Sequence, residues 1–310
     1  MKLKNVIRTN ISADNRKEKL KGLSSGLFCY IILIGIGFVY LYPILYMVII
    51  SVMPTDDLIN PTVNWIPSAI DFGSYASVYK ALDYSNSLFI TLLLSSVSAV
   101  VQTVVCAIAG YSLARFSVPA KKLWIVILLV VFIIPAEVVS VPRYVLFNQY
   151  HLVGSLFSVY LPAILGQGLK SSLFILLFMQ SFSSYPKSYD EAAQLDGAGS
   201  IHIFFRVALP LAVPIVILSL LFSFIWYWNE TTQAGLLLSG YYDTLPLKLE
   251  QFDATYQDMF AAAVGNSANR LNERVQMSAT ILAIAPLVLL YFIVQKGMIS
   301  SVESAGVTGE

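Results

Sequence analysis

Apolar residues occur in long runs that are separated by short polar connections. A helix needs about 20 mostly apolar residues to cross a bilayer. Six runs approach or exceed that length, at residues 27–52, 88–109, 123–146, 156–179, 209–228 and 279–294. The first run is too long and too aromatic for a signal-peptide core, so we expect it to be retained. The pattern predicts an all-α integral membrane protein with about six transmembrane helices.

The positions of lysine and arginine predict how these helices are oriented. Both residue types gather before the first run and again between the second and third runs, whereas the connection after the first run is acidic. Cytoplasmic loops carry the excess of positive charge, so alternation places both termini in the cytoplasm. The resulting boundaries are a basic cytoplasmic segment (1–24), a membrane domain (25–298) with an inner loop (183–208) and an outer loop (229–276), and a cytoplasmic tail (299–310).

Composition supports a membrane protein and excludes several function classes. The chain is 57% hydrophobic and 12% charged, whereas soluble domains carry about 25% charged residues. The net charge of +1 favours no nucleic-acid partner. The two cysteines lie inside apolar runs and the two histidines stand apart, so no metal site is predicted. Without a phosphate-binding loop or a nucleophile–base pair, we expect no catalytic residue and no cofactor bound by this chain.

The inner loop has the most informative pattern. Residues 186–210 have the sequence PKSYDEAAQLDGAGSIHIFFRVALP. We predict a short helix over residues 188–194, capped by Ser188, with acidic residues in its first turn and Gly197 as its stop. A second helix is predicted from Ser200. Its expected packing face consists of Ile201, Phe204 and Phe205.

This loop resembles the EAA coupling loop of ABC importer permeases. The resemblance rests on the Glu-Ala-Ala triplet, the following glycine, a phenylalanine and the Leu-Pro pair at the family's spacing. It implies that one set of residues couples the chain to an ATPase: Glu191, Ala192, Ala193, Asp196, Gly197, Phe204 and Pro210. The alternative interpretation is an ordinary amphipathic loop between two spans.

Further segments are similar to the carbohydrate-importing, maltose-type branch of these permeases. They are AGYSLARF at residues 109–116, Ile-Pro at 134–135 followed by PRY at 142–144, Trp-Asn at 228–229, and a short glycine-bearing tail at 306–309. Two features depart from that branch. Arg143 replaces an apolar residue, and the outer loop is longer at residues 265–274.

The resemblance implies a type I ABC importer permease in a bacterial plasma membrane. It also implies a second homologous permease subunit, a dimer of ATPase subunits that hold ATP and Mg, and an extracellular solute-binding protein that docks on part of residues 241–272. The expected cargo is a sugar or oligosaccharide. An ion-gradient-driven secondary transporter is the alternative, but that class needs paired intramembrane acids, and only Glu137 is found. An amino-acid, phosphate or metal-chelate permease would lack the branch-specific segments, and a membrane enzyme is the least supported class.

Ionisable groups at membrane depth are costly and need a cavity or a partner. Glu137 and Lys170 fit this description as ligands of sugar hydroxyls, and Lys170 can also contact an acidic sugar. The alternatives are that Glu137 lies at the membrane interface or that the two residues form a structural pair. Aromatic rings that can stack on a sugar, or lie in the interfacial belt, are Tyr111, Tyr144, Tyr160, Tyr227 and Trp228. The predicted substrate-pathway set is Glu137, Tyr144, Lys170, Trp228 and Asn229.

Overall fold

The computed structural model describes residues 2–60, 65–260 and 271–307, with side chains described over 26–60, 65–260 and 271–295. Every regular element in those residues is helical, which confirms the predicted all-α class. The elements are α1 (Lys2–Ser51), α2 (Thr55–Leu58), α3 (Gly73–Ala81), α4 (Tyr84–Arg115), α5 (Lys121–Ile133), α6 (Ala136–Gln149), α7 (Phe157–Ile164), α8 (Ser171–Ser184), α9 (Ser188–Leu195), α10 (Ser200–Ile203), the π-helical turn η1 (Phe204–Ala208), α11 (Leu209–Leu211), α12 (Val213–Trp228), α13 (Thr232–Leu237), α14 (Leu245–Glu250), α15 (Phe252–Phe260) and α16 (Glu273–Val307).

The chain divides into two compact units. Unit 1 comprises Met1–Ser74 and Asn272–Ile281, and unit 2 comprises Tyr75–Leu271 and Leu282–Glu310. The predicted boundary after residue 24 falls within the continuous helix α1, and the predicted tail at 299–310 begins within α16. Most of the long outer-loop insertion at 265–274, and the last residues of the tail, lie outside the described residues.

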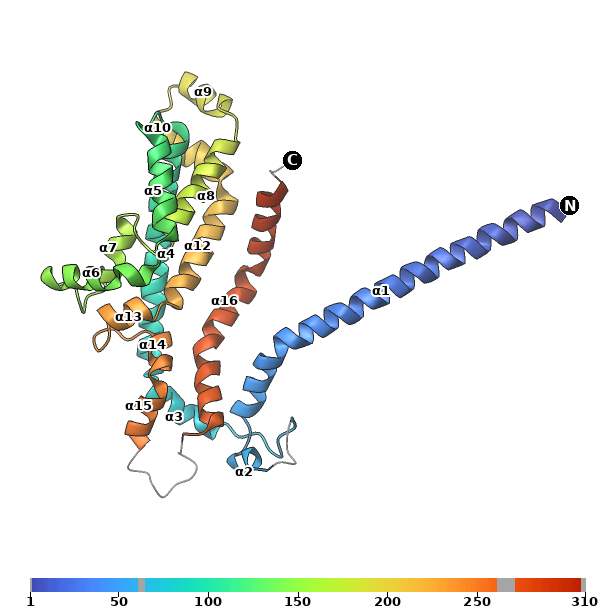
Figure 1. Ribbon diagram of the computed structural model, residues 1–310, viewed down its shortest axis with the longest axis horizontal. Helices are drawn as coiled ribbons and strands as arrows, with labels where there is room; N and C mark the ends of the chain where they lie inside the picture. Colours follow the sequence, from blue (N-terminus) through green and yellow to red (C-terminus); the bar gives the residue numbers. More distant parts are fainter. Residues whose placement is uncertain (1, 61–64, 261–270, 308–310) are drawn as a thin grey trace. The chain divides into compact units, whose positions relative to one another are not determined.

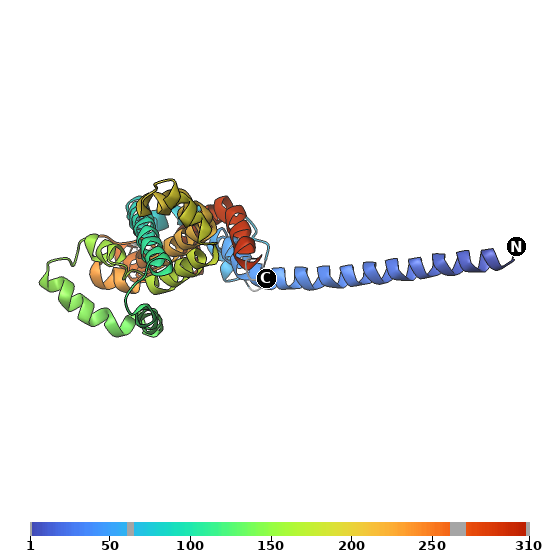
Figure 2. The same ribbon diagram turned by 90° about the horizontal axis from the view of Figure 1, so that it is seen from above.

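Three helical segments of the described chain are long and apolar enough to cross a membrane: Gly26–Ser51, Tyr84–Arg115 and Glu273–Gln295. The expected span at 123–146 is instead split by a 95° bend between α5 and α6. Figures 1 and 2 both show α6 running away from α5 at the bend. Pro135 causes this break, because it lacks an N–H and forces the preceding Ile134 into extended backbone (φ −65°, ψ 122°).

Two other expected spans are also interrupted. The run at 156–179 forms α7 and α8, separated by a turn in which Gly166 has a φ of +72° and Lys170 a φ of +55°. The last expected span before the outer loop has an 81° bend between Ser200–Leu211 and Val213–Trp228. If each of the two bent pairs crosses the membrane once, the described chain has up to five spans. Apolarity along the chain therefore predicted where apolar helices occur but not where they break.

The core of unit 2 forms where α4 packs against α8 and α12, which lie side by side in Figures 1 and 2. Gly110 permits the close approach of α4 to α8. A Cβ atom at this position would lie 2.8 Å from the Met179 amide nitrogen and 2.9 Å from the Ile175 carbonyl oxygen. The buried cluster around it consists of Cys106, Ala107, Tyr111, Phe174, Ile175, Phe178, Phe182, Phe204, Ala208 and Ala212.

A buried polar network stabilises the non-helical turn before α8. Gln102 of α4, which is 0% exposed, donates from Nε2 to the Leu169 carbonyl oxygen (2.7 Å) and to Ser223 Oγ (3.0 Å). The Tyr227 hydroxyl donates to Gln102 Oε1 (2.7 Å) and accepts from the Leu169 amide (3.2 Å). Gly168 is required beside them, because a Cβ there would collide with both side chains. These bonds satisfy backbone groups that lipid cannot.

The described residues of the predicted outer loop are largely helical. Its helices α13, α14 and α15 belong to unit 2, and α14 packs against α4. The Leu245 amide donates to Thr91 Oγ1 of α4 (2.7 Å), and the Gly154 amide donates to the Leu237 carbonyl oxygen (2.7 Å). Leu237, Leu238 and Leu245 are buried beneath these bonds. This segment therefore forms part of the core of unit 2.

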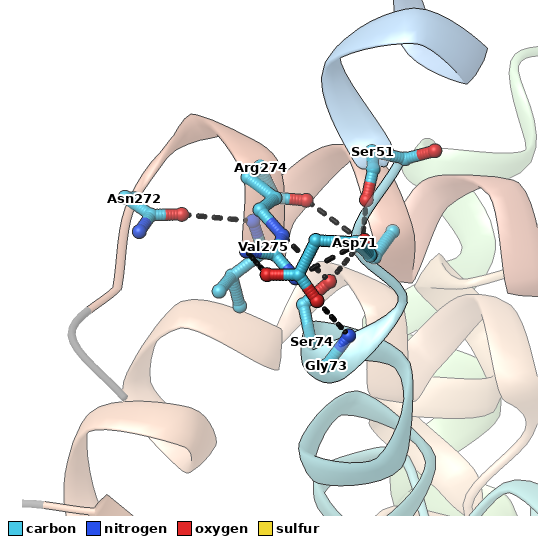
Figure 3. A network of polar contacts seen from close by, with 8 residues as sticks. Ser51, Asp71, Gly73, Ser74, Asn272, Arg274 and Val275 are labelled. Carbon is cyan, nitrogen blue, oxygen red and sulfur yellow. Dashed lines mark hydrogen bonds and ion pairs between the residues drawn. The ribbon is translucent and has the colours of Figure 1, made fainter. Parts of the chain in front are cut away.

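In unit 1, Arg274 joins three segments that are distant in sequence (Figure 3). Its Nη1 lies 2.7 Å from Asp71 Oδ2, and its Nε donates to Ser74 Oγ over 3.3 Å. The Ser74 and Ser278 hydroxyls share a 2.8 Å hydrogen bond, and Ser278 Oγ donates to the Ser51 carbonyl oxygen over 3.1 Å. The network connects the end of α1, the start of α3 and the first turns of α16.

We predict that Gly110→Ala destabilises unit 2. The added methyl group must displace the α8 backbone, and overpacking of this kind costs about 1–3 kcal/mol. Thermal unfolding of the purified protein in detergent should show a lower midpoint. Gly35→Ala is the matched control, because nothing lies within 4 Å of a Cβ at Gly35. Equal midpoints for the two variants would contradict the close packing of α4 and α8.

We also predict an acid-sensitive contribution from Asp71. The Arg274 guanidinium, and then the Gly73 backbone N–H, lower the pKa of Asp71. As the pH falls, Asp71 therefore binds a proton in the unfolded chain before it does so in the folded chain. The contribution of Asp71 to the free energy of unfolding is full above about pH 4 and is lost as the pH falls through the folded-state pKa. The Asp71 side chain is 46% exposed, so we expect only about 1 kcal/mol.

The measurement for this prediction is the unfolding midpoint in detergent as the pH is lowered below about 4. Asp71→Asn should lower the midpoint at neutral pH and flatten its decline in acid. Asp56→Asn is the control, because Asp56 is exposed. An unchanged acid dependence in Asp71→Asn would show that other groups are responsible.

Candidate functional site

The inner loop forms two short helices at one end of the α4, α5 and α8 group (Figure 1). Helix α9 spans Ser188–Leu195, one residue longer than predicted, and α10 begins at Ser200 as predicted. The predicted cap was wrong. Lys187 occupies the N-cap position, Ser188 is the first helical residue, and no side chain caps the helix. The acidic residues of the first turn still lie at the positive end of the helix dipole.

Gly197 reverses the chain after α9. The Ala198 amide donates to the Ala193 carbonyl oxygen, and the Gly197 amide to the Gln194 carbonyl oxygen, both over 2.9 Å. This pair of bonds is a Schellman motif, which needs a left-handed residue at its turn. Gly197 supplies it with a φ of +82°, whereas Gly199 has an ordinary φ of −75°. The glycine of the motif therefore fixes the angle at which α10 follows α9.

A buried ion pair holds α9 against the end of α4. Arg115 Nε lies 3.4 Å from Asp190 Oδ2, with side chains that are 6% and 13% exposed. Arg115 Nη2 donates to the Tyr185 carbonyl oxygen (2.7 Å), its guanidinium lies 3.6 Å above the Tyr185 ring, and the Tyr185 hydroxyl donates to Asp190 Oδ1 (2.9 Å). Burial, and then the bond to Asp190, raise the pKa of the Tyr185 hydroxyl, so it remains a donor.

The packing face of the second helix differs from the prediction. Phe204 is buried as predicted, but its buried neighbour is Ile203, whereas Ile201 and Phe205 are 78% and 56% exposed. The buried face continues instead through Ala208, because Phe204 and Ala208 join the cluster formed by α4 and α8. The Phe204 ring packs on Tyr111 of α4, with ring centroids 5.1 Å apart.

The opposite surface of the loop is exposed. Glu191, Ala192, Asp196 and Gly197 are accessible, and Ala193 is half-buried. Leu195 is 90% exposed at the end of α9. Ile201 and Phe205 leave further apolar side chains exposed on the same loop. Pro210 is also exposed, but it belongs to α11 beside the 81° bend rather than to the α9–α10 surface.

The predicted substrate-pathway residues do not form one group. Trp228 is 2% exposed and lies within the core of unit 2, as do Tyr111 and Tyr227, so these three rings pack against protein, and their predicted roles stay predictions. Tyr144 is half-buried, and Asn229 is exposed where α12 ends. The predicted structural pair is absent from the described ion pairs, which include neither Glu137 nor Lys170.

Lys170 lines a cavity of about 290 Å³ in unit 2, in the bend between α5 and α6. Arg143 of α6 lines it as well and donates from Nη1 to Gln233 Oε1 (3.0 Å). Glu137 does not line it. The remaining lining residues are Val131, Phe132, Ile134, Ala136, Val139, Gln167, Gly168, Leu169, Ser171, Ser172 and Gln233. Arg143 was not predicted from the sequence as a pathway residue. The one sequence feature that pointed to it was its replacement of an apolar residue of the carbohydrate branch.

Comparison with known protein families decides what kind of protein carries this loop. The family of binding-protein-dependent transport system inner membrane components matches residues 102–303, which include α9, α10 and the whole α8–α12 core. The chain belongs to this family. The expectation of a membrane-embedded transport subunit is therefore confirmed, and we refer to the chain as the permease.

Individual relatives extend beyond the matched segment. The permease is 26% identical to the maltodextrin transport system permease protein of Streptococcus pneumoniae, over 95% of this chain and 100% of that protein. It is 28% identical to the diacetylchitobiose uptake system permease protein of Streptomyces coelicolor, over 90% of this chain and 95% of that protein. Both relatives are therefore matched along nearly their whole length.

A solved structure has the same fold. It is the crystal structure of a bacterial ABC transporter involved in the import of the acidic polysaccharide alginate. The TM-score is 0.73 at 23% identity, and the match covers 87% of the permease and 95% of that chain.

We predict that the Arg115–Asp190 pair determines how often α9 detaches. Removing one partner of a buried pair leaves an uncompensated charge, so Arg115→Met and Asp190→Asn should each promote local opening. The measurement is tryptic cleavage after the exposed Lys187, which precedes α9. We expect at least about tenfold faster cleavage in each single variant, equivalent to about 1.4 kcal/mol.

The double variant should open less than the sum of the two single effects, because no lone charge remains buried. Asp258→Asn is the control, because Asp258 is exposed on α15. Additive effects of the two single variants would contradict a direct interaction between Arg115 and Asp190.

Proposed function

We propose that the permease imports a sugar or oligosaccharide across the bacterial plasma membrane, driven by ATP hydrolysis on separate subunits. One observation carries the proposal: the α9–α10 loop is fastened to the membrane helices on one side and exposes Glu191 and Leu195 on the other. A surface of this kind can receive a displacement from a partner and pass it on as a rigid body. Membership of a binding-protein-dependent family supports this role.

In this proposal α9 and α10 form the EAA coupling loop. Glu191 offers a charge for orienting the ATPase, and the small side chains of Ala192 and Ala193 allow its surface to approach. Gly197 fixes the angle between the two helices, and Asp196 ends α9 beside it. The bend beside Pro210 connects this loop to α12. The loop meets one subunit of an ATPase dimer that holds the ATP and Mg.

The proposed assembly contains partners on both sides of the membrane. A second homologous permease completes the transport pathway, and an extracellular solute-binding protein delivers the cargo to part of residues 241–272. We also propose about six spans with both termini in the cytoplasm, following the distribution of lysine and arginine. The sugar cargo rests on the carbohydrate-branch segments and on relatives whose names specify maltodextrin and diacetylchitobiose.

We predict that changes to the coupling loop uncouple transport from ATP hydrolysis. Glu191→Lys reverses the charge offered to the ATPase, and Gly197→Val forces a β-branched residue into a left-handed conformation. Both should abolish uptake, and hydrolysis stimulated by the loaded binding protein, in liposomes containing the full complex. Gly199→Val is the matched control, because Gly199 has an ordinary φ and nothing lies within 4 Å of a Cβ at either glycine.

Co-purification of the ATPase subunits is measured for each variant. A variant that still co-purifies with the ATPase but no longer transports has lost coupling rather than assembly. Normal uptake by Glu191→Lys, or by liposomes without ATP, would overturn the proposal and favour the secondary-transporter alternative.

A further inference from the structure

The cavity at the α5–α6 bend contains positive charge without a matching negative charge. Lys170 and Arg143 are its charged lining residues, and no carboxylate lines it. The described ion pairs include neither side chain. A cation in a membrane-spanning segment costs about 2.5–3.5 kcal/mol unless a partner or water compensates it. A cavity that retains two such cations is therefore suited to an anion.

The uncharged lining groups favour a polyhydroxylated ligand over a simple ion. Gln167, Gln233 and Ser172 supply amide and hydroxyl groups, which can both donate and accept hydrogen bonds. The Phe132 ring adds an apolar face, and Lys170 Nζ lies 6.0 Å from its centroid. Aromatic rings with polar groups around them suit the alternating apolar face and hydroxyl edge of a sugar ring.

Both cations are held in place by the surrounding structure, Lys170 through its backbone conformation and Arg143 through a side-chain hydrogen bond. Lys170 adopts a left-handed φ of +55° immediately before α8, in the turn that the Gln102 network stabilises. Arg143 is oriented by its 3.0 Å bond to Gln233, and a guanidinium with one bond made still has donors for a carboxylate. At about 290 Å³ the cavity lies at the small end of ligand sites. It therefore has room for a single sugar unit.

We propose that this cavity binds one carboxylate-bearing unit of an acidic saccharide, with Lys170 and Arg143 as the residues that select for the carboxylate. The proposal rests on the proposed import of saccharides and narrows its substrate class to uronic-acid sugars. Arg143 replaces an apolar residue of the carbohydrate branch, and this replacement is the change that turns a neutral wall into an anion-binding one. Lys170 would then contribute a second charge to the same group.

The test compares charged and neutral forms of the same sugars. Short oligosaccharides of galacturonate, glucuronate and mannuronate, and their methyl esters, are titrated calorimetrically into the full complex in phosphatidylcholine nanodiscs, without ATP or binding protein. The methyl ester keeps every ring hydroxyl and removes the charge. We expect at least one oligosaccharide to bind about tenfold or more tightly than its ester. Phosphatidylcholine is used because its headgroup has no net charge, so no anionic lipid competes with the uronate for the cavity.

Variants assign the binding to this cavity. Lys170→Met and Arg143→Met should each remove most of the preference for the acid and leave affinity for the ester unchanged. Lys122→Met is the control, because Lys122 is an exposed cation in the first turn of the same α5 helix but does not line the cavity. If no acid binds better than its ester, or if the preference survives in both cavity variants, the proposal is wrong. The same is true if Lys170→Met weakens only the binding of added phosphatidylglycerol.

The outcome is separable from that of the proposed function. If Glu191→Lys abolishes the uptake of a neutral sugar while no uronate binds the permease better than its methyl ester, the import function stands and the acidic cargo does not. If the uronate binds in the cavity but Glu191→Lys leaves the rate of uptake unchanged, the cavity assignment stands and the coupling mechanism fails.

Discussion

The fold depends on satisfying backbone polar groups where the chain leaves helical geometry inside a membrane. Lipid offers no hydrogen bonds, so an irregular turn at that depth must be bonded by the protein itself. In the permease this requirement falls on Gln102, whose amide bonds the turn before α8 and also the Tyr227 hydroxyl of α12. The same side chain therefore connects the three helices of the core, and it places Lys170 at the edge of a cavity. Replacing Gln102 by an apolar residue would leave the Leu169 carbonyl without this donor, at a cost of about 1–3 kcal/mol.

Where α9 meets the end of α4, buried charges rather than amides must find partners within the protein. Arg115 ends α4, and its guanidinium is nearly covered by Tyr185 and Asp190. A buried pair of this kind is weak evidence for stability, because desolvation offsets much of the attraction. The pair instead fixes the orientation of α9, because Asp190 can form an ion pair with Arg115 only when α9 lies in one orientation. Glu191, the next residue, is then directed to the exposed surface, so a buried acid and an exposed acid in adjacent positions have different roles.

Sequence patterns predicted the parts of this molecule that depend on local chemistry. The first residue of α9, the start of α10 and the turn at Gly197 all follow from short-range signals and agree with the structure, whereas the end of α9 lies one residue beyond the prediction. The family resemblance carried by the same loop was confirmed by the family match. Features that depend on distant contacts were missed. The predicted face of the second helix was wrong because packing of Phe204 and Ala208 against α4 and α8 sets that face, and these contacts are distant in sequence. The Arg115–Asp190 pair joins residues 75 positions apart by their numbering (190 minus 115), which no periodicity reveals.

The continuity of α4 gives these separate interactions a mechanical relation. Gln102 and Arg115 are 13 residues apart by numbering (115 minus 102) on one unbroken helix, a separation of about 20 Å. Phe204, which follows α10, packs on Tyr111, which lies between them on the same helix. Close-packed interiors transmit displacement because they have few voids in which to absorb it. A partner that moves the α9–α10 surface therefore acts on α4 at two points, an ion pair and an aromatic contact. Gln102 of the same helix bonds the turn that carries Lys170, so α4 connects the α9–α10 surface to the lining of the cavity.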